Sequence, residues 1–340
     1  MAISAVIFGC EALTVTDWER DFFARTNPLG FILFLRNCQS PAQVRALVAD
    51  LRSCVGRADA PVLIDQEGGR VARLKPPHWR AAPAAARFGE MAGTDLSRAC
   101  KAAKINAGLL AAELHDLGIS VDCVPLLDLP AAGADRVIGD RAFAADPDVV
   151  AALGRAVCEG MLAGGVMPVV KHMPGHGRAQ VDSHHALPVV DTPRDELEAT
   201  DFRPFAVLAD APWGMTAHVV YSAIDPQAPA TTSRTVIDEI IRGFIGFDGV
   251  LVSDDLSMQA LHGGLAERAA ASLTAGCDVA LHCNGKPAEM TAVAEATPAL
   301  SAEAERRLAA AAARLGRPGP ADMPALQARF DRLMASTAAG

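Results

Sequence analysis

The chain has 340 residues, of which 51% are hydrophobic and 21% are charged, and its formal net charge is −9 at pH 7 with a pI of about 5.5. This length suffices for one large domain or two ordinary ones with a substantial core. Nucleic acids and anionic membranes are bound by clustered Lys and Arg, so the net negative charge argues against both kinds of partner.

The N-terminal stretch Met1–Cys10 is apolar, but it has no basic segment and is too short to cross a membrane. It therefore predicts a first buried strand rather than a signal peptide. The eight cysteines are scattered without any C-x-x-C spacing, as a reducing cytosol permits, and we interpret them as small core residues. Together these features predict a cytoplasmic protein.

Eight short apolar runs, each bounded by turn residues, predict eight strands in chain order. They are Ile3–Phe8, Phe31–Leu35, Pro61–Ile64, Ile119–Val124, Val166–Val170, Gly214–Val219, Val250–Val252 and Cys277–Leu281. Between most of them lie helix-like segments, several of which begin with Ser, Thr, Asp or Pro and end near Gly. These segments are Pro41–Val55, Leu96–Leu117, Asp148–Ala163, Thr192–Ala209, Ser233–Ile241 and Leu265–Ala275.

The strand runs are apolar on both faces, which is typical of a parallel sheet covered by helices. Eight β-then-α units predict an α/β protein, a single-domain (β/α)₈ TIM-type barrel that spans residues 1–340, with a doubly wound open sheet as the alternative. The Ala-rich tail, from about residue 298 to 340, predicts terminal helices at Pro298–Leu315 and Ala325–Leu333 that pack on the outside.

Polar residues follow each of the later strand runs, where a barrel places its active site. These residues are Asp65, Glu67, Arg70 and Arg73 after the third run, Asp128 and Gly139–Arg141 after the fourth, Lys171 and His172 after the fifth, His218 after the sixth, Ser253–Asp255 after the seventh, and His282 and Asn284 after the eighth. A merely solvated rim more often carries Ser, Thr, Lys and Glu. This set of Asp, Arg and His therefore favours a functional site.

The segment after the fifth run carries the densest chemistry of the chain. Lys171 and His172 lead into Pro174 and two glycines, which favour an irregular loop, and the loop holds His176, His184 and His185. Asp182 lies two residues before His184, so it is placed to orient that imidazole and to stabilise its charged form. An imidazole titrates near pH 6.5 and is suited to general acid and base catalysis at neutral pH.

Five motifs resemble those of the family 3 glycoside hydrolases in order and spacing, and the likeness extends from about Ile3 to Asn284. The motifs are Asp65–Val71 (DQEGGRV), Ile138–Phe143 (IGDRAF), Lys171–Gly177 (KHMPGHG), Asp182–His184 (DSH) and Ser253–Met258 (SDDLSM). The chain is most similar to the single-domain bacterial β-N-acetylglucosaminidases that recycle peptidoglycan. One departure is Met173, where the family usually has Phe.

The resemblance implies a role for each matching residue. Asp254 would be the nucleophile, and His184 the general acid/base supported by Asp182. The implied sugar-binding residues are Asp65, Arg73, Arg141, Lys171 and His172. Ion pairing at the rim is the structural alternative for the two arginines, and we expect the neighbouring carboxylates Glu67 and Asp255 to lie outside the functional set.

The expected activity is that of a cytoplasmic, retaining exo-β-N-acetylglucosaminidase that works through a covalent glycosyl-enzyme intermediate and needs no metal or other cofactor. The implied substrates are N-acetylglucosaminyl-anhydromuramyl peptides, with no nucleic-acid or membrane partner.

Two other classes of function remain as alternatives. A metal-dependent hydrolase could use His172 and His184 with Asp182, but the chain has no H-x-x-x-H spacing, and the Lys171 cation opposes a metal at this position. A non-catalytic sugar-binding barrel is the second alternative, since a fold alone does not imply activity.

Overall fold

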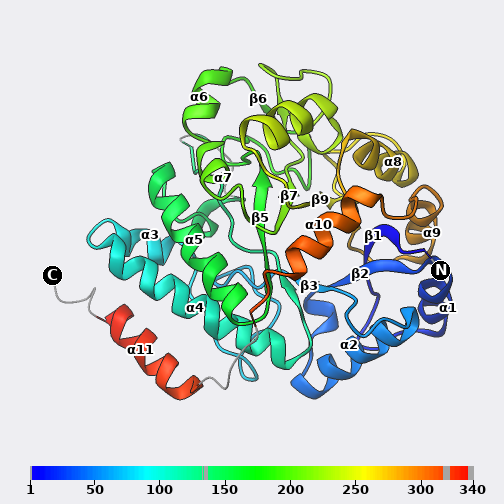
Figure 1. The fold of residues 1–340 in the computed structure, drawn as a ribbon, viewed down its shortest axis with the longest axis horizontal. Helices are drawn as coiled ribbons and strands as arrows, with labels where there is room; N and C mark the ends of the chain where they lie inside the picture. Colours follow the sequence, from blue (N-terminus) through cyan, green and yellow to red (C-terminus); the bar gives the residue numbers. More distant parts are fainter. Residues whose placement is uncertain (1, 132, 134–136, 317–321, 336–340) are drawn as a thin grey trace.

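The computed structural model describes residues 2–131, 133, 137–316 and 322–335, and within them eight parallel strands form a closed barrel (Figure 1). In barrel order the strands are β1 (Ser4–Gly9), β10 (Val279–His282), β9 (Val250–Asp255), β7 (Trp213–Thr216), β5 (Met167–Met173), β4 (Val121–Asp122), β3 (Val62–Ile64) and β2 (Pro28–Leu33). Strand β1 pairs with β2 on one side and with β10 on the other, which closes the sheet. The predicted (β/α)₈ barrel is confirmed, and the open-sheet alternative is wrong.

Alternate side chains of each strand point to opposite sides of the barrel wall. In β1, Ile7 belongs to the cluster inside the barrel, whereas Val6 and Phe8 pack outward against the helices. In β2, Ile32 points inward in the same way. Both sides of the wall are therefore apolar, which explains why the strand runs lack polar alternation.

Helices surround the barrel (Figure 1). They are α1 (Asp17–Thr26), α2 (Pro41–Val55), α3 (Ala86–Ala92), α4 (Leu96–Asp116), α5 (Pro147–Ala163), α6 (Arg194–Ala199), α7 (Arg203–Val207), the π-helix η4 (Val236–Phe244), α8 (Leu265–Ala275), α9 (Pro287–Glu295), α10 (Ala302–Ala312) and α11 (Met323–Ala335). The predicted start signals act as expected: the side chains of Ser40, Asp95 and Asp146 cap the first turns of α2, α4 and α5.

Two predicted helices differ from the structure. The segment Thr192–Ala209 forms two short helices, α6 and α7, because the chain turns at Thr200 and restarts with Pro204 in the first turn of α7, where no proline N–H is needed. The segment Ser233–Ile241 forms the π-helix η4, and the Ser233 hydroxyl accepts the backbone N–H of Val236 at its start. Helices α1, α3 and α9 were not among the predicted segments.

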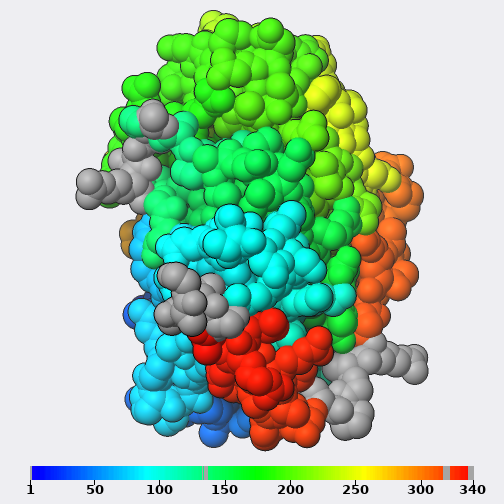
Figure 2. All heavy atoms as spheres, turned by 90° about the vertical axis from the view of Figure 1, so that its left-hand side faces the viewer, coloured from blue at the N-terminus to red at the C-terminus, as the bar shows by residue number. Residues whose placement is uncertain are grey.

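The two tail helices lie in different places. Helix α11 packs on the outside, as predicted, and lies against α4 (Figure 2). Arg98 of α4 donates to the carbonyl of Leu333. Helix α10 also lies at the surface, but over the end of the barrel: its Ala311 belongs to the cluster inside the barrel, and Leu308 and Leu315 pack against that cluster. Residues 317–321 and 336–340 of the predicted tail lie outside the described residues.

Helix α10 therefore covers the end of the barrel at which the strands begin. The segment before it pairs with the start of β1, where Ala5 donates to the carbonyl of Pro298 and Leu300 donates to that of Ile3. The opposite end, where the strands finish, is left for a site. Within the described ranges, no helix is both long and apolar enough to span a bilayer.

The interpretation of the cysteines as small core residues holds for five of the eight, because Cys38, Cys54 and Cys100 are only partly buried. All eight are free thiols, and five of them are buried: Cys10, Cys123, Cys158, Cys277 and Cys283.

Candidate active site

A pocket of about 470 Å³ opens at the carboxyl end of the barrel strands. All eight residues that the sequence singles out line it, and they come from segments that follow β3, β4 and β5 and from β5 and β9 themselves. They are Asp65, Arg73, Arg141, Lys171, His172, Asp182, His184 and Asp254. Loops that are far apart in the sequence thus bring the predicted residues together.

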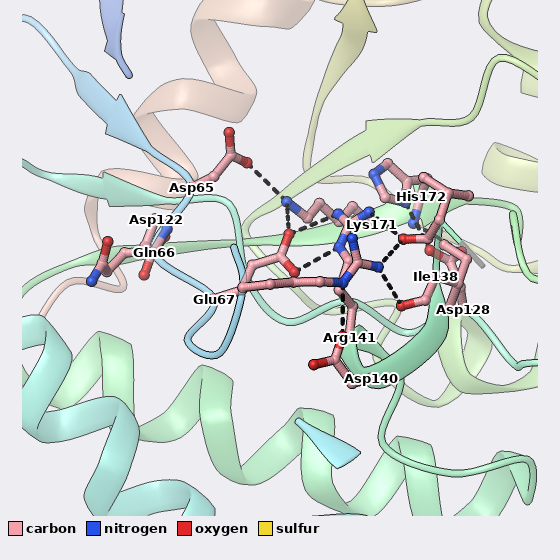
Figure 3. A network of polar contacts seen from close by, with 12 residues as sticks. Asp65, Gln66, Glu67, Asp122, Asp128, Ile138, Asp140, Arg141, Lys171 and His172 are labelled. Carbon is pink, nitrogen blue, oxygen red and sulfur yellow. Dashed lines mark hydrogen bonds and ion pairs between the residues drawn. The ribbon is translucent and has the colours of Figure 1, made fainter. Parts of the chain in front are cut away.

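Lys171 is the central cation of the pocket (Figure 3). Its side chain is only 2% exposed, and Nζ lies 2.9 Å from Asp65 Oδ1 and 2.7 Å from Glu67 Oε1. Burial alone would lower the pKa of this ammonium, but the two carboxylates outweigh burial and raise it. Lys171 is therefore charged at neutral pH.

Asp65 is held between two cations. Its second oxygen, Oδ2, accepts a hydrogen bond of 3.0 Å from Arg73. Burial would raise the pKa of Asp65, yet Lys171 and Arg73 hold it well below its usual range. The carboxylate is ionised, and its orientation is fixed on both oxygens.

Glu67 forms a two-point ion pair with Arg141, with Nε to Oε2 at 2.9 Å and a terminal nitrogen to Oε1 at 2.8 Å (Figure 3). Burial acts to raise the pKa of Glu67, but Lys171 and Arg141 lower it to about 2. Glu67 was expected to lie outside the functional set, but it lines the pocket, so this expectation is wrong as regards its position. Glu67 also forms ion pairs with Arg141 and Lys171, two of the residues predicted to bind the sugar. Arg141 adopts the ion-paired alternative and also lines the pocket.

His172 is oriented by Asp128, which follows β4. Asp128 Oδ2 lies 2.7 Å from His172 Nδ1, and Oδ1 accepts the backbone N–H groups of His172 (3.2 Å) and His176 (2.6 Å). Burial would raise the pKa of Asp128, but His172 lowers it, so Asp128 is a carboxylate. A carboxylate can only accept, so Nδ1 of His172 carries the proton.

Asp254 lies near the end of β9 and is a partly buried carboxylate in the pocket wall. Burial by itself raises its pKa, but the imidazoles of His218 and His172 outweigh burial and lower it. Asp254 is therefore ionised at neutral pH. The neighbouring Asp255 turns its oxygens to Ser257 and to the backbone N–H of Cys283, so it is a structural acceptor, as expected, although it also borders the pocket.

Asp182 and His184 form a hydrogen-bonded pair at the mouth of the pocket. His184 Nδ1 lies 2.7 Å from Asp182 Oδ1, which also accepts the backbone N–H of His184 at 2.9 Å. Burial slightly opposes ionisation of Asp182, but the hydrogen bonds from His184 lower its pKa. The imidazole is 60% exposed. Asp182 therefore fixes Nδ1 as the protonated nitrogen and directs Nε2 away from itself.

Six other polar residues predicted at the rim are absent from the described pocket wall: Asp128, Asp140, His218, Ser253, His282 and Asn284. His218 is fully buried and lies 2.7 Å from Thr231 Oγ1 and 3.0 Å from the carbonyl oxygen of Asp255. Its position shows why strand-end polarity alone is an imperfect guide: a side chain at a strand end can also pack behind the wall. As far as the described residues extend, no three His, Cys, Asp or Glu side chains group to hold a metal ion.

Comparison with known proteins adds independent findings. The family model "Glycosyl hydrolase family 3 N terminal domain" matches residues 15–317. The chain is 41% identical over 292 residues to a beta-hexosaminidase of Chromobacterium violaceum, a match that covers 85% of this chain and 80% of that protein. It is 42% identical over 261 residues to a beta-hexosaminidase of Bordetella avium, with 75% and 73% covered.

Among solved structures, NagZ from Neisseria gonorrhoeae in complex with N-trifluoroacetyl-D-glucosamine is similar to this chain with a TM-score of 0.85 and 34% sequence identity. The match covers 98% of this chain and 97% of the other.

Proposed function

The chain belongs to glycosyl hydrolase family 3 and is a glycoside hydrolase, and we propose that it is a retaining exo-β-N-acetylglucosaminidase with Asp254 as nucleophile and His184 as general acid/base. One observation carries this proposal: an ionised carboxylate and a carboxylate-oriented imidazole line the same pocket. Retaining hydrolysis needs one group that attacks the anomeric carbon and one that exchanges a proton with the leaving oxygen.

In the first step Asp254 attacks the anomeric carbon while the glycosidic C–O bond breaks and His184 gives its proton to the departing oxygen. In the second step His184 takes a proton from water, and that water displaces Asp254 from the sugar. Asp182 stabilises the charged form of His184 in the resting enzyme. Asp254 is held by a barrel strand, which suits a nucleophile that must be placed with sub-ångström accuracy.

The ion-paired residues deeper in the pocket would bind the sugar hydroxyls. Asp65 accepts hydrogen bonds, whereas Lys171, Arg73, Arg141 and His172 donate them. Support comes from the fixed charges of this group, because each member is already oriented by a partner. A preorganised set of this kind loses little entropy when it binds a hydroxylated ring.

The substrate that we propose is a terminal N-acetylglucosamine on an anhydromuramyl peptide derived from peptidoglycan. The two relatives compared above are named beta-hexosaminidases, and a solved neighbour was crystallised with an N-acylated glucosamine. The pocket volume is within the range of small-ligand sites. Eight free cysteines fit a reducing cytoplasm as the compartment, and a metal or other cofactor has no role in the proposed chemistry.

The test is a pair of aryl β-glycosides that differ only at C2. A site built to bind the acetamido group leaves its own polar groups unpaired when that group is missing, so we expect kcat/KM to be larger for the 2-acetamido sugar by at least about 10²-fold. Asp65→Ala should lower both values and leave their ratio unchanged. Equal kcat/KM for the two glycosides would refute the proposed substrate class, and hydrolysis of neither would refute the proposed activity.

A further inference from the structure

The proposed acid/base pair lies on a segment that has little regular structure of its own. Residues 174–188, between β5 and β6 (Val189–Val190), contain turns and bends but neither a helix nor a strand. Asp182 and His184 face the pocket and are partly exposed. The segment must therefore be tied to the barrel if His184 is to stay in place while a proton is transferred.

Ser183, between the two members of the pair, is the inward-facing residue of this stretch. It is only 3% exposed, and its hydroxyl oxygen lies 3.0 Å from Nε2 of His176. Its carbonyl also accepts the backbone N–H of Ala260, from the loop that follows β9. The Ser183 side chain thus connects the acid/base pair to a buried imidazole.

His176 is itself fixed to the barrel. It is 3% exposed, and its backbone N–H donates to Asp128 Oδ1 at 2.6 Å, the carboxylate that also orients His172. The next residue must be glycine, because a Cβ on Gly177 would lie 1.7 Å from the carbonyl oxygen of Leu129. The glycine permits the close approach that brings His176 to Asp128.

The imidazole of His176 borders the pocket but is almost completely buried. Burial lowers its pKa to about 4, with a further contribution from His172, so the ring is neutral at pH 7. Its Nδ1 is buried without a hydrogen-bond partner among the described residues. The hydrogen bond between Nε2 and the Ser183 hydroxyl is therefore the contact through which this ring can act on the acid/base pair.

We propose that His176 is a positioning residue that acts through Ser183 to hold His184 at the pocket mouth, with Asp128 joining this link to the sugar-facing His172. The inference rests on the proposed function, since it assigns His184 the proton transfer. It adds a role for two residues, His176 and Ser183, that belong to neither the nucleophile nor the sugar-binding group.

The proposal predicts a loss that depends on the leaving group. Ser183→Ala removes the hydroxyl with little change in volume, so His184 remains but is less well placed. A displacement of about 1 Å can cost about 10²-fold, and we expect kcat/KM for a methyl β-N-acetylglucosaminide to fall about 10- to 100-fold. The 2,4-dinitrophenyl glycoside needs no protonation, so its kcat/KM should stay within about threefold of the wild-type value.

Two further variants make the result specific. His176→Ala should give the same pattern, and Ser183→Ala should add no further loss in the His176→Ala background, because both substitutions break one hydrogen bond. Val181→Ala is the matched control, since Val181 is exposed on the same segment and outside the pocket wall, and it should leave both substrates unaffected.

The outcomes separate this inference from the proposed function. If the wild-type protein hydrolyses neither glycoside, the proposed function fails. If it hydrolyses both and Ser183→Ala and His176→Ala slow the two substrates equally, or slow neither, the positioning role is overturned. A thermal melt of each variant shows whether an equal loss comes from unfolding.

Discussion

Two partly buried carboxylates of the pocket, Asp65 and Asp254, are prepared for different tasks by their neighbours. Asp65 is paired with Lys171 and Arg73, which occupy both of its oxygens. The charge of Asp254 is stabilised by the nearby imidazoles of His218 and His172. A carboxylate that must form a bond to carbon has to remain available, so the contrast supports Asp254 as the nucleophile and Asp65 as a binding group.

Asp254→Ala should abolish nearly all turnover, a loss of at least about 10³-fold, while the protein stays folded, because the covalent intermediate can no longer form. With wild-type protein, a 2- or 5-fluoro glycosyl substrate should label Asp254, and peptide mass spectrometry would locate the label. A label on Asp255, or no label combined with tight binding of an oxazoline-type inhibitor, would point to another nucleophile.

The sequence predicted which residues line the pocket but not how they are connected. The eight chosen side chains follow strands or occur in motifs, and both signals are local. Asp128 acts through His172, 44 residues away, and Glu67 through Arg141, 74 residues away, so their roles depend on the way the barrel closes. Glu67 offered one local signal, since it lies two residues after Asp65 in the same motif.

At the scale of elements, apolar runs and helix-start residues were sufficient to predict the barrel. The predicted helix start at Pro41 matches that of α2, and the predicted start at Asp148 is one residue after that of α5, because the chemistry of helix starts is local. The location of α10 was not predictable in this way. An Ala-rich amphipathic helix fits the outer ring as well as the barrel end, and only the three-dimensional structure distinguishes the two.

Because α10 lies at the end of the barrel opposite the pocket, we expect a substitution in α10 to lower the stability of the protein without changing its activity. Leu308 is partly buried against the cluster inside the barrel, so Leu308→Ala should lower the free energy of unfolding by about 1–2 kcal/mol. The pocket lies at the other end, so KM should not change. Denaturant unfolding and steady-state kinetics measure the two effects. The exposed neighbour Ala309→Ser serves as the control, and an unchanged unfolding midpoint for Leu308→Ala would contradict the packing role of α10.

In the whole molecule, the two ends of the barrel differ. One end is covered by α10, and the other end, the charged end, carries the pocket. The charged end lowers folding stability, because ionisable groups lose hydration when they are brought together there. It brings Asp65, Glu67, Asp122 and Lys171 close together in a poorly solvated region. One of these ionisable groups, Asp122, has a carboxyl oxygen without a hydrogen-bond partner among the described residues. Folding stability should therefore respond to pH through the least satisfied of these groups.

That group is Asp122, at the end of β4. Its Oδ1 accepts the backbone N–H of Gln66 at 2.9 Å, whereas its Oδ2 is buried and has no hydrogen-bond partner in the described part of the chain. Burial raises the pKa of Asp122 to about 8, against about 3.9 for an unfolded aspartate. Between these values the folded state binds more protons than the unfolded state, so the contribution of Asp122 to stability decreases as pH rises from about 4 to about 8.

Asp122→Asn replaces this carboxyl with an amide that does not titrate, and it keeps an oxygen for the Gln66 N–H. The unfolding free energy of the variant relative to wild type should therefore increase with pH, by up to about 1.4 kcal/mol per pH unit between pH 5 and pH 8. Denaturant unfolding at pH 5, 6.5 and 8 measures this slope, with the exposed Asp59→Asn as a control that should show none. A difference between Asp122→Asn and wild type that is the same at all three pH values would mean that Asp122 is already ionised in the folded protein, and that Lys171 outweighs its burial.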